Sequence, residues 1–252
     1  GEAAGVLGDG PVRGVPLVVK DPDGFQAGGP YHAGITTLRD RDFRPTQDTE
    51  LNARFRRAGF VVVGRTNTPE LGLVPTTEPI SYGPTRNPWD PGGSAAAVAS
   101  RMVAVGHAGD GGGPIRIPAS ERGLVGLFPT RGRITLGPEV GEAWGGLVRR
   151  FVVCRSVRDV AAVLDAVAGP LPGDPYVTPP TGPYLEALGG DPGRLRVGIT
   201  TTPPDPMVTT DPQVAAATEA AGALLASVGH DVEEAHPAAW DDQEWLGAFT
   251  GH

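Results

Sequence analysis

The part of the sequence with the clearest chemical potential is a run of three glycines, Gly111–Gly113, between Asp110 and a short apolar segment. Glycine permits positive φ and lets backbone N–H groups approach a bound atom closely. Successive N–H groups in such a turn form a concave anion site, which in an acyl-transfer enzyme would hold the oxyanion of a tetrahedral intermediate. A tight, solvent-facing turn has the same composition, so the glycines alone leave both interpretations open.

Motifs on both sides of the turn favour the catalytic interpretation. In chain order they are Gly-Val-Pro-Leu-Val-Val-Lys-Asp at 14–21, Gly-Arg-Thr-Asn-Thr-Pro-Glu-Leu-Gly at 64–72, Gly-Pro-Thr-Arg-Asn-Pro-Trp-Asp-Pro at 83–91, Gly-Gly-Ser-Ala-Ala-Ala-Val-Ala at 92–99 and Gly-Leu-Val-Gly-Leu-Phe-Pro-Thr-Arg-Gly at 123–132. Several multi-residue matches in order are more specific than one short motif. The set resembles the amidase signature family, the Ser–cisSer–Lys amide hydrolases, over residues 14–169.

The resemblance implies a site in which a lysine base, a bridging serine and a nucleophilic serine act together. Lys20 matches the lysine, and a lysine acts as a base only where burial or neighbouring positive charge lowers its pKa. Asp21 could instead hold this ammonium as an ion pair. The family's Gly-Gly-Ser-Ile-Arg carries the nucleophile, and that position is Pro114 here. The bridging serine is missing, because residues 90–93 read Asp-Pro-Gly-Gly, about eight residues short of the family motif.

Proline at position 114 removes two groups that the reaction needs. It has no hydroxyl, so no acyl-enzyme ester forms there, and it has no N–H, so one oxyanion donor is lost. Its ring also biases Gly113 towards extended conformations. Three residues could replace the nucleophile by type, although none has a base in its local sequence: Ser100, Ser120 and Cys154.

Three further positions have two interpretations each. Ser94 matches the serine that starts the family's alanine-rich helix, so we expect it to cap that helix; it would replace the bridging serine only if the short loop moved it inward. Asp110 and Arg116 could pair across the glycine turn and fix its shape, as the resemblance implies, or be two unrelated charges. With the glycines at 111–113, Trp144 is a candidate substrate-binding residue, although tryptophan is more often packing material.

Composition limits the classes of function. The chain has 252 residues, 39% of them hydrophobic, which is enough for a sizeable core. A net charge of −8 without a long basic run disfavours nucleic-acid binding. One cysteine, Cys154, excludes an internal disulfide and a multi-cysteine metal site, and we expect it to be buried. No apolar run reaches the ~18 residues of a membrane span and no secretory signal opens the chain, so we expect a cytoplasmic protein without metal or cofactor.

The elements expected to position these residues alternate between strands and helices, as in an α/β fold. Apolar and β-branched runs predict strands at 15–19, 60–63, 195–200 and 231–234. Apolar spacing predicts helices at 48–58, 94–105, 156–168 and 211–228. The expected N-caps are Asp48, Ser94, Ser156 and Asp211, and the expected helix ends include Gly59 and Gly229. Connections rich in proline and glycine are expected at 66–91 and 169–183.

Together these features predict one α/β domain with the amidase-signature fold: a mixed central sheet flanked by helices, truncated relative to the family. We expect a signature core at about 14–169 and a C-terminal α/β part at about 170–252, stopping inside apparently helical sequence. Missing family segments would help to wall the substrate cleft, and their absence would favour a homo-oligomer.

The function that follows is that of the amide and lactam C–N hydrolase lineage, impaired in catalysis by Pro114, with a small-molecule amide or lactam as ligand. Asp-Gly-Gly-Gly at 110–113 and Gly-Glu-Ala-Trp-Gly-Gly-Leu at 141–147 resemble the branch of the 6-aminohexanoate cyclic dimer hydrolases. The alternatives are an active amidase that uses Ser94 and a non-catalytic ligand-binding scaffold. A phosphate-binding protein is disfavoured, because no Lys-Ser/Thr follows the glycines.

Overall fold

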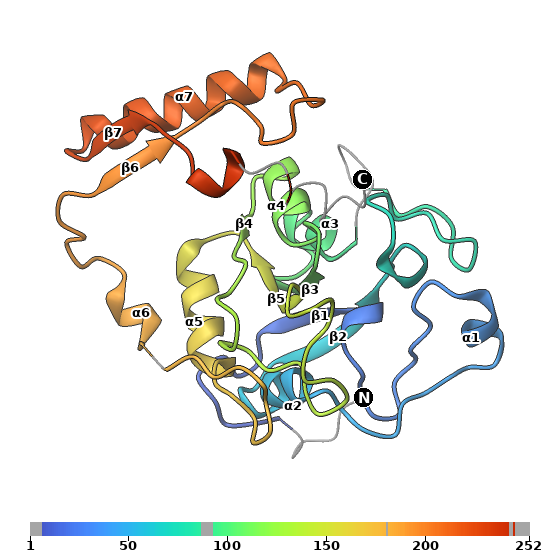
Figure 1. Cartoon of the computed structure of the whole chain (residues 1–252). Coiled ribbons are helices and arrows are strands. Elements are labelled where there is room, and N and C mark those ends of the chain that lie inside the picture. Colours follow the sequence, from blue (N-terminus) through green and yellow to red (C-terminus); the bar gives the residue numbers. More distant parts are fainter. Residues whose placement is uncertain (1–6, 87–92, 180, 242–243, 245–252) are drawn as a thin grey trace. The chain divides into compact units, whose positions relative to one another are not determined.

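The computed structural model describes residues 7–86, 93–179, 181–241 and 244. The junction at 90–92 and the chain end at 250–252 therefore lie outside the described residues. The chain forms two compact units, residues 1–188 and 189–252 (Figure 1). The Asp165 carboxylate accepts the N–H groups of Tyr184 and Leu185, at 2.6 and 2.9 Å, which ties this segment to the larger unit.

The larger unit is built on a five-stranded mixed sheet of order β2-β1-β3-β5-β4 (Figure 1). β1 (Pro16–Lys20) pairs in parallel with β2 (Val61–Thr66) and with β3 (Val105–Asp110). β5 (Arg149–Cys154) pairs antiparallel with β3 and with β4 (Val125–Gly126). Because β1, β2 and β3 are parallel, their last residues, Lys20, Thr66 and Asp110, lie at the same edge of the sheet. This confirms the predicted mixed sheet.

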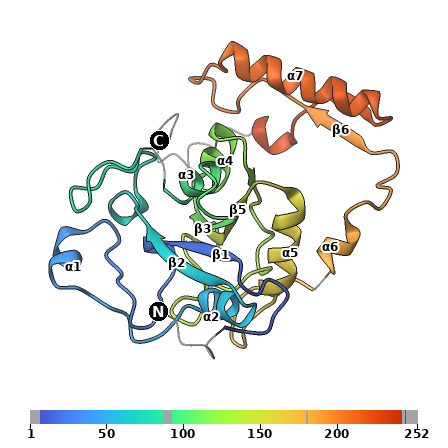
Figure 2. The ribbon, with the colours of Figure 1, turned by 180° about the vertical axis from the view of Figure 1, so that it is seen from behind.

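Helices cover both faces of this sheet. Gly106 and His107 are neighbours in β3. Gly106 lies against Ser94 and Val98 of α3 (Ser94–Ala99), whereas the His107 ring contacts Phe55 of α2 (Glu50–Arg57). Successive strand residues point to opposite faces, so α3 and α2 cover different faces, and the sheet lies between them in Figures 1 and 2. The other helices of this unit are α1 (Thr36–Asp40), α4 (Arg116–Glu121), α5 (Val157–Val167) and α6 (Tyr184–Ala187), with 3-10 turns at Asp21–Asp23 and Glu70–Gly72.

The N-caps are partly as expected. Ser156 caps α5 by accepting the Asp159 N–H at 3.1 Å, as predicted. The prediction of Asp48 as the cap of α2 is wrong by one residue, since Thr49 accepts the Asn52 N–H at 3.4 Å. Asp48 is used elsewhere, because its carboxylate accepts the Ala27 N–H at 2.7 Å.

The alanine-rich helix is shorter than predicted. α3 ends at Ala99, residues 100–104 are not helical, and Val105, the last residue of the predicted helix, begins the fully buried strand β3. The guanidinium of Arg155 donates to the carbonyl oxygens of Val98 and Val103, at 3.0 and 2.8 Å, and so binds both sides of the chain reversal. This contact comes from a residue more than fifty positions away, so the local pattern did not contain it.

The smaller unit is a β-α-β arrangement of β6 (Arg196–Ile199), α7 (Pro212–Ser227) and β7 (Asp231–Glu234), followed by the 3-10 turn Ala238–Asp241. β6 and β7 are parallel. Asp211 caps α7 by accepting the Gln213 N–H at 2.8 Å, and Gly229 follows the helix with φ of +102°, as predicted. Across the described residues, none of the helices combines the length and the apolar character that crossing a bilayer requires.

Candidate active site

The carboxylate of Asp110, at the end of β3, fixes the glycine turn. Its Oδ1 accepts the Gly113 N–H at 2.8 Å, and its Oδ2 accepts the N–H groups of Ile115 and Arg116 at 3.2 and 3.3 Å. The Arg116 guanidinium binds the same carboxylate through Nε and Nη2, at 2.9 and 3.0 Å. Burial alone raises the pKa of Asp110, but these hydrogen bonds and the Arg116 charge bring it below its ordinary value. The predicted pairing of Asp110 with Arg116 is confirmed.

The same hydrogen bonds decide which N–H groups of the turn are available to a ligand. Asp110 occupies the Gly113 N–H, and Pro114 has none. In the part of the chain that the structure describes, the N–H groups of Gly111 and Gly112 make no hydrogen bond. Gly113 must be glycine, since its φ is +129° and an added Cβ would lie 2.4 Å from Cδ1 of Ile117. Two of the predicted oxyanion donors therefore remain, at Gly111 and Gly112.

Lys20 is the only lysine among the 21 Lys and Arg residues of the chain. Its side chain is 11% exposed at the end of β1, and its Nζ lies 3.5 Å from Oδ2 of Asp23. The same Oδ2 accepts the Gly109 N–H at 3.0 Å. Asp21, the expected ion-pair partner, instead binds Nε of Arg65 at 3.2 Å. Asp23, and not Asp21, therefore pairs with Lys20, because the chain after β1 turns the Asp23 side chain back towards β3. The Asp23 carboxylate thus links Lys20 to the strand that leads into the glycine turn.

Charged groups surround Asp23. Burial raises the pKa of Asp23, but the positive charges of Lys20 and Arg150 outweigh this and hold it below its ordinary value. His107 lies beside this group inside the protein, and burial lowers the pKa of its imidazole to about 3 despite the nearby Asp23 carboxylate. His107 is therefore neutral at pH 7, and its two ring nitrogens have no hydrogen-bond partner among the described residues.

Ser94 is buried, but it neither caps α3 nor contacts Lys20 through a hydrogen bond. Gly93 occupies the N-cap position, and the Ser94 Oγ lies 2.6 Å from Oγ1 of Thr66. Thr66 is the register partner of Lys20 in the β1–β2 pair, so Ser94 does lie near this edge of the sheet. The Gly93–Ser94 peptide is trans, since the cis bond of the described residues is Gly137–Pro138. Lys20 and Ser94 thus have different partners, Asp23 and Thr66.

Trp144 lies next to the glycine turn. Trp144 is 62% exposed, and a Cβ added to Gly111 would lie 3.0 Å from Cε3 and Cζ3 of the Trp144 ring. Val148 approaches the same position, since its Cγ2 would lie 3.1 Å from that Cβ. A ligand on Gly111 would therefore contact the Trp144 ring, and the role of Trp144 in substrate binding stays a prediction.

Comparison with known proteins identifies the family of this chain. A model of the Amidase family matches residues 3–245. The chain belongs to the Amidase family. It is 43% identical to the 6-aminohexanoate-cyclic-dimer hydrolase of Paenarthrobacter ureafaciens, over 97% of this chain and 52% of that protein. It is also 43% identical to the putative amidase AmiB2 of Mycobacterium tuberculosis, over 88% of this chain and 47% of that protein.

Solved structures agree with this assignment. A 6-aminohexanoate cyclic dimer hydrolase complexed with substrate matches with a TM-score of 0.90 and 41% identity, over 96% of this chain and 52% of the other. A bacterial aryl acylamidase of the amidase signature family matches with a TM-score of 0.78 and 25% identity, over 90% and 48%. This amidase-family chain therefore has the predicted amidase-signature fold and spans about half the length of the curated relatives it matches.

Substitute nucleophiles are poorly placed in this amidase-family chain. Cys154 is fully buried in β5, as predicted, and burial raises the pKa of its thiol to about 12, so the thiol is protonated at neutral pH. Ser100 follows the end of α3 and Ser120 lies within α4.

Within the described residues, no group of three or more His, Cys, Asp or Glu side chains is arranged to hold a metal ion.

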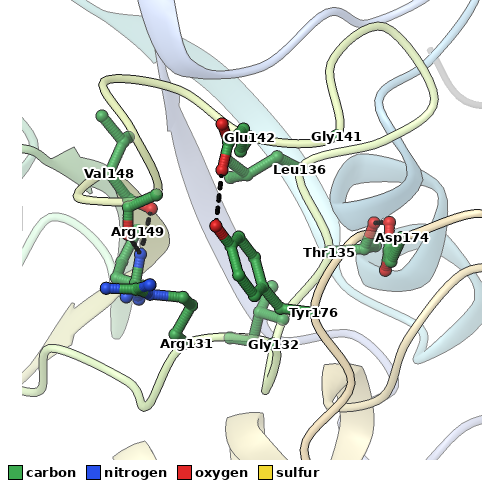
Figure 3. A pocket seen from close by; sticks show the side chains of 12 residues that line it. Arg131, Gly132, Thr135, Leu136, Gly141, Glu142, Val148, Arg149, Asp174 and Tyr176 are labelled. Carbon is green, nitrogen blue, oxygen red and sulfur yellow. Dashed lines mark hydrogen bonds between the residues drawn. The ribbon is translucent and has the colours of Figure 1, made fainter.

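A small pocket in the same amidase-family unit was not predicted from the sequence (Figure 3). Its volume of about 20 Å³ is close to what one water molecule needs. Val148 belongs both to its wall and to the surroundings of Gly111, so the pocket adjoins the glycine turn. The side chains that define it in Figure 3 are Arg131, Glu142, Arg149, Asp174 and Tyr176. The one sequence signal was the glycine-rich segment around Trp144, which forms part of the wall.

Proposed function

We propose that this chain is a ligand-binding member of the amide and lactam hydrolase lineage, and that with proline at position 114 it forms no acyl-enzyme. The observation that carries the proposal is Pro114. The Asp110 carboxylate fixes the backbone on both sides of it, at Gly113 and Ile115. The family's nucleophile belongs at this point, and proline supplies neither a hydroxyl nor an N–H there.

Two other features support ligand binding without this chemistry. The N–H groups of Gly111 and Gly112 are available to an amide carbonyl oxygen, and the exposed Trp144 ring lies beside them. Lys20, in contrast, pairs with Asp23, whose Oδ2 lies 3.5 Å from the Lys20 Nζ, so a carboxylate already occupies the side chain that would act as the base. The ligand that fits is a small amide or lactam.

The test is covalent labelling together with an amide hydrolysis assay. We expect no adduct with a serine-directed fluorophosphonate and no release of amine from 6-aminohexanoate cyclic dimer or from simple amides. Binding of the cyclic dimer, measured by calorimetry, should remain. An adduct on any side chain that mass spectrometry places next to the glycine turn would contradict the proposal, and so would turnover.

Restoring the hydroxyl alone should not restore the enzyme. We expect the Pro114→Ser variant to show turnover far below that of an amidase, because the ion pair with Asp23 still occupies Lys20 and the bridging serine is still absent. Steady-state kinetics on the cyclic dimer measures this directly. Normal turnover in this single variant would show that the bridging serine is dispensable here.

A second candidate is an active amidase that uses Ser94. It is favoured by the position of the Ser94 hydroxyl, which is buried near the edge of the sheet where Lys20 ends β1. Ser94→Ala separates the two candidates. Activity that is present in the original chain and absent from this variant would support the second candidate, whereas the absence of activity from both supports the first.

A further inference from the structure

We propose that Arg131 and Arg149 bind a carboxylate of the ligand, and that the natural ligand is a small amide carrying a free acid group. The proposal rests on the proposed function, because it assigns a charged group to the ligand of the same site. Two guanidinium groups with open donors are suited to a carboxylate, since their planar forks match its two oxygens.

The first observation is that the charge of Arg149 is buried without a counter-charge. Its side chain donates only to backbone carbonyl oxygens: Nε to Pro129 at 3.1 Å, and Nη1 to Gly146 and Val148 at 2.6 and 2.7 Å. The residue is 8% exposed. Buried charges are normally paired with an opposite charge, so this guanidinium lacks its usual partner.

The second observation is that Arg131 lies close to it. The Arg149 Nη1 donates to the carbonyl oxygen of Gly146, and a Cβ added to Gly146 would lie 3.4 Å from Cζ of Arg131. The Arg131 guanidinium lies 5.0 Å from the centre of the Tyr176 ring. Burial, together with the positive charge of Arg131, lowers the pKa of Arg149. An anion between the two groups would relieve this repulsion.

The acidic residues of the pocket do not neutralise the two arginines. Glu142 accepts the Tyr176 hydroxyl at 2.8 Å, and Asp174 accepts the Thr135 hydroxyl at 2.8 Å (Figure 3). In the ranges covered by the structure, neither Arg131 nor Arg149 is among the residues that form an ion pair. The arginine side of the pocket therefore has positive charge and free N–H donors, while the carboxylates are bonded to hydroxyl groups.

The position next to the glycine turn connects this pocket to the amide. Trp144 and Val148 lie against Gly111, and Val148 and Arg149 also line the pocket. A ligand whose amide carbonyl oxygen accepts the Gly111 N–H would have Trp144 and Val148 beside it, and only its carboxylate would have to enter the small pocket at Arg149. The apolar surfaces of Trp144 and Val148 suit a short aliphatic chain between amide and carboxylate.

The experiment compares hexanamide with adipic acid monoamide, which differ in the terminal carboxylate. Binding to the full chain is measured by isothermal calorimetry at low salt. We expect the monoamide to bind at least tenfold tighter than hexanamide and the Arg131→Gln variant to lose this preference. Arg133→Gln is the matched control, because Arg133 also stacks on a tyrosine, Tyr184, at 5.5 Å, but lies outside the pocket. This control should keep the preference.

Four results would overturn the proposal: equal affinity for the two amides, loss of the preference in both variants, inorganic phosphate binding as tightly as the monoamide, or no binding at all. Equal, measurable affinity would leave the proposed amide ligand standing, so the two failures are distinguishable. Binding of adipate without any binding of hexanamide would support the arginine site and contradict the amide ligand. Thermal unfolding of each variant checks that the fold is intact, which the exposure of Arg131 favours.

Discussion

Replacing Asp110 with asparagine should lower the free energy of unfolding by about 3 kcal/mol, because hydrogen bonds to a buried charged group are worth about 1.5–3 kcal/mol each. The Asp110 side chain has no exposed surface and accepts the N–H groups of Gly113, Ile115 and Arg116. An asparagine amide would direct an NH₂ group at donors that need an acceptor. Urea unfolding with linear extrapolation measures the difference.

Arg116→Gln is the matched control for this prediction. It removes the other partner of the same ion pair, but its side chain is 52% exposed, so solvent screens the charge and we expect a much smaller loss. Equal losses in the two variants would show that the ion pair, and not the backbone hydrogen bonds, fixes the turn.

The pH dependence of the Asp110 contribution has a defined sign. The pKa of Asp110 is lowered in the folded state, so the unfolded state takes up a proton first as the pH falls. The contribution is therefore complete above about pH 4, the ordinary range of an aspartate, and is lost as the pH falls through the folded pKa. The asparagine variant should lack this part of the acid destabilisation.

Replacing Lys20 with methionine should lower the free energy of unfolding by about 3 kcal/mol, because removing one partner of a buried ion pair leaves the other charge uncompensated. The two side chains are 11% and 17% exposed. The double variant Lys20→Met/Asp23→Asn should be closer to the original protein, since it removes both charges and leaves an oxygen for the Gly109 N–H. A double-mutant cycle measures the coupling free energy.

The exposed pair of Arg44 and Asp42 provides the control, and Arg44→Gln should leave stability unchanged within error. A second readout uses the single lysine. An amine-reactive reagent modifies only Lys20 and the α-amino group, and we expect Lys20 to react far more slowly in folded than in unfolded protein. Fast labelling and a negligible effect of Lys20→Met would show that the ion pair with Asp23 does not form, which would free Lys20 to act as a base.

The sequence by itself determined what depends on neighbours along the chain. The apolar runs at 15–19 and 60–63 became β1 and β2, and Ser156 and Asp211 cap their helices, because strand pattern and helix capping involve residues only a few positions apart. The ordered motifs around the glycine turn were enough to predict the family and the mixed sheet. Asp110 and Arg116 could be paired for the same reason, since six positions separate them.

Tertiary structure decided which distant groups meet. The alanine-rich pattern at 94–105 did not show that Arg155 would bind the chain reversal after Ala99, or that a buried strand would begin at Val105. The adjacency of Lys20 and Asp21 suggested an ion pair, but consecutive strand-end residues point in different directions, and Asp23 meets Lys20 instead. The juxtaposition of Arg131, Arg149 and Gly146 has the same origin, because pairing between distant strands, and not spacing along the chain, brings such groups together.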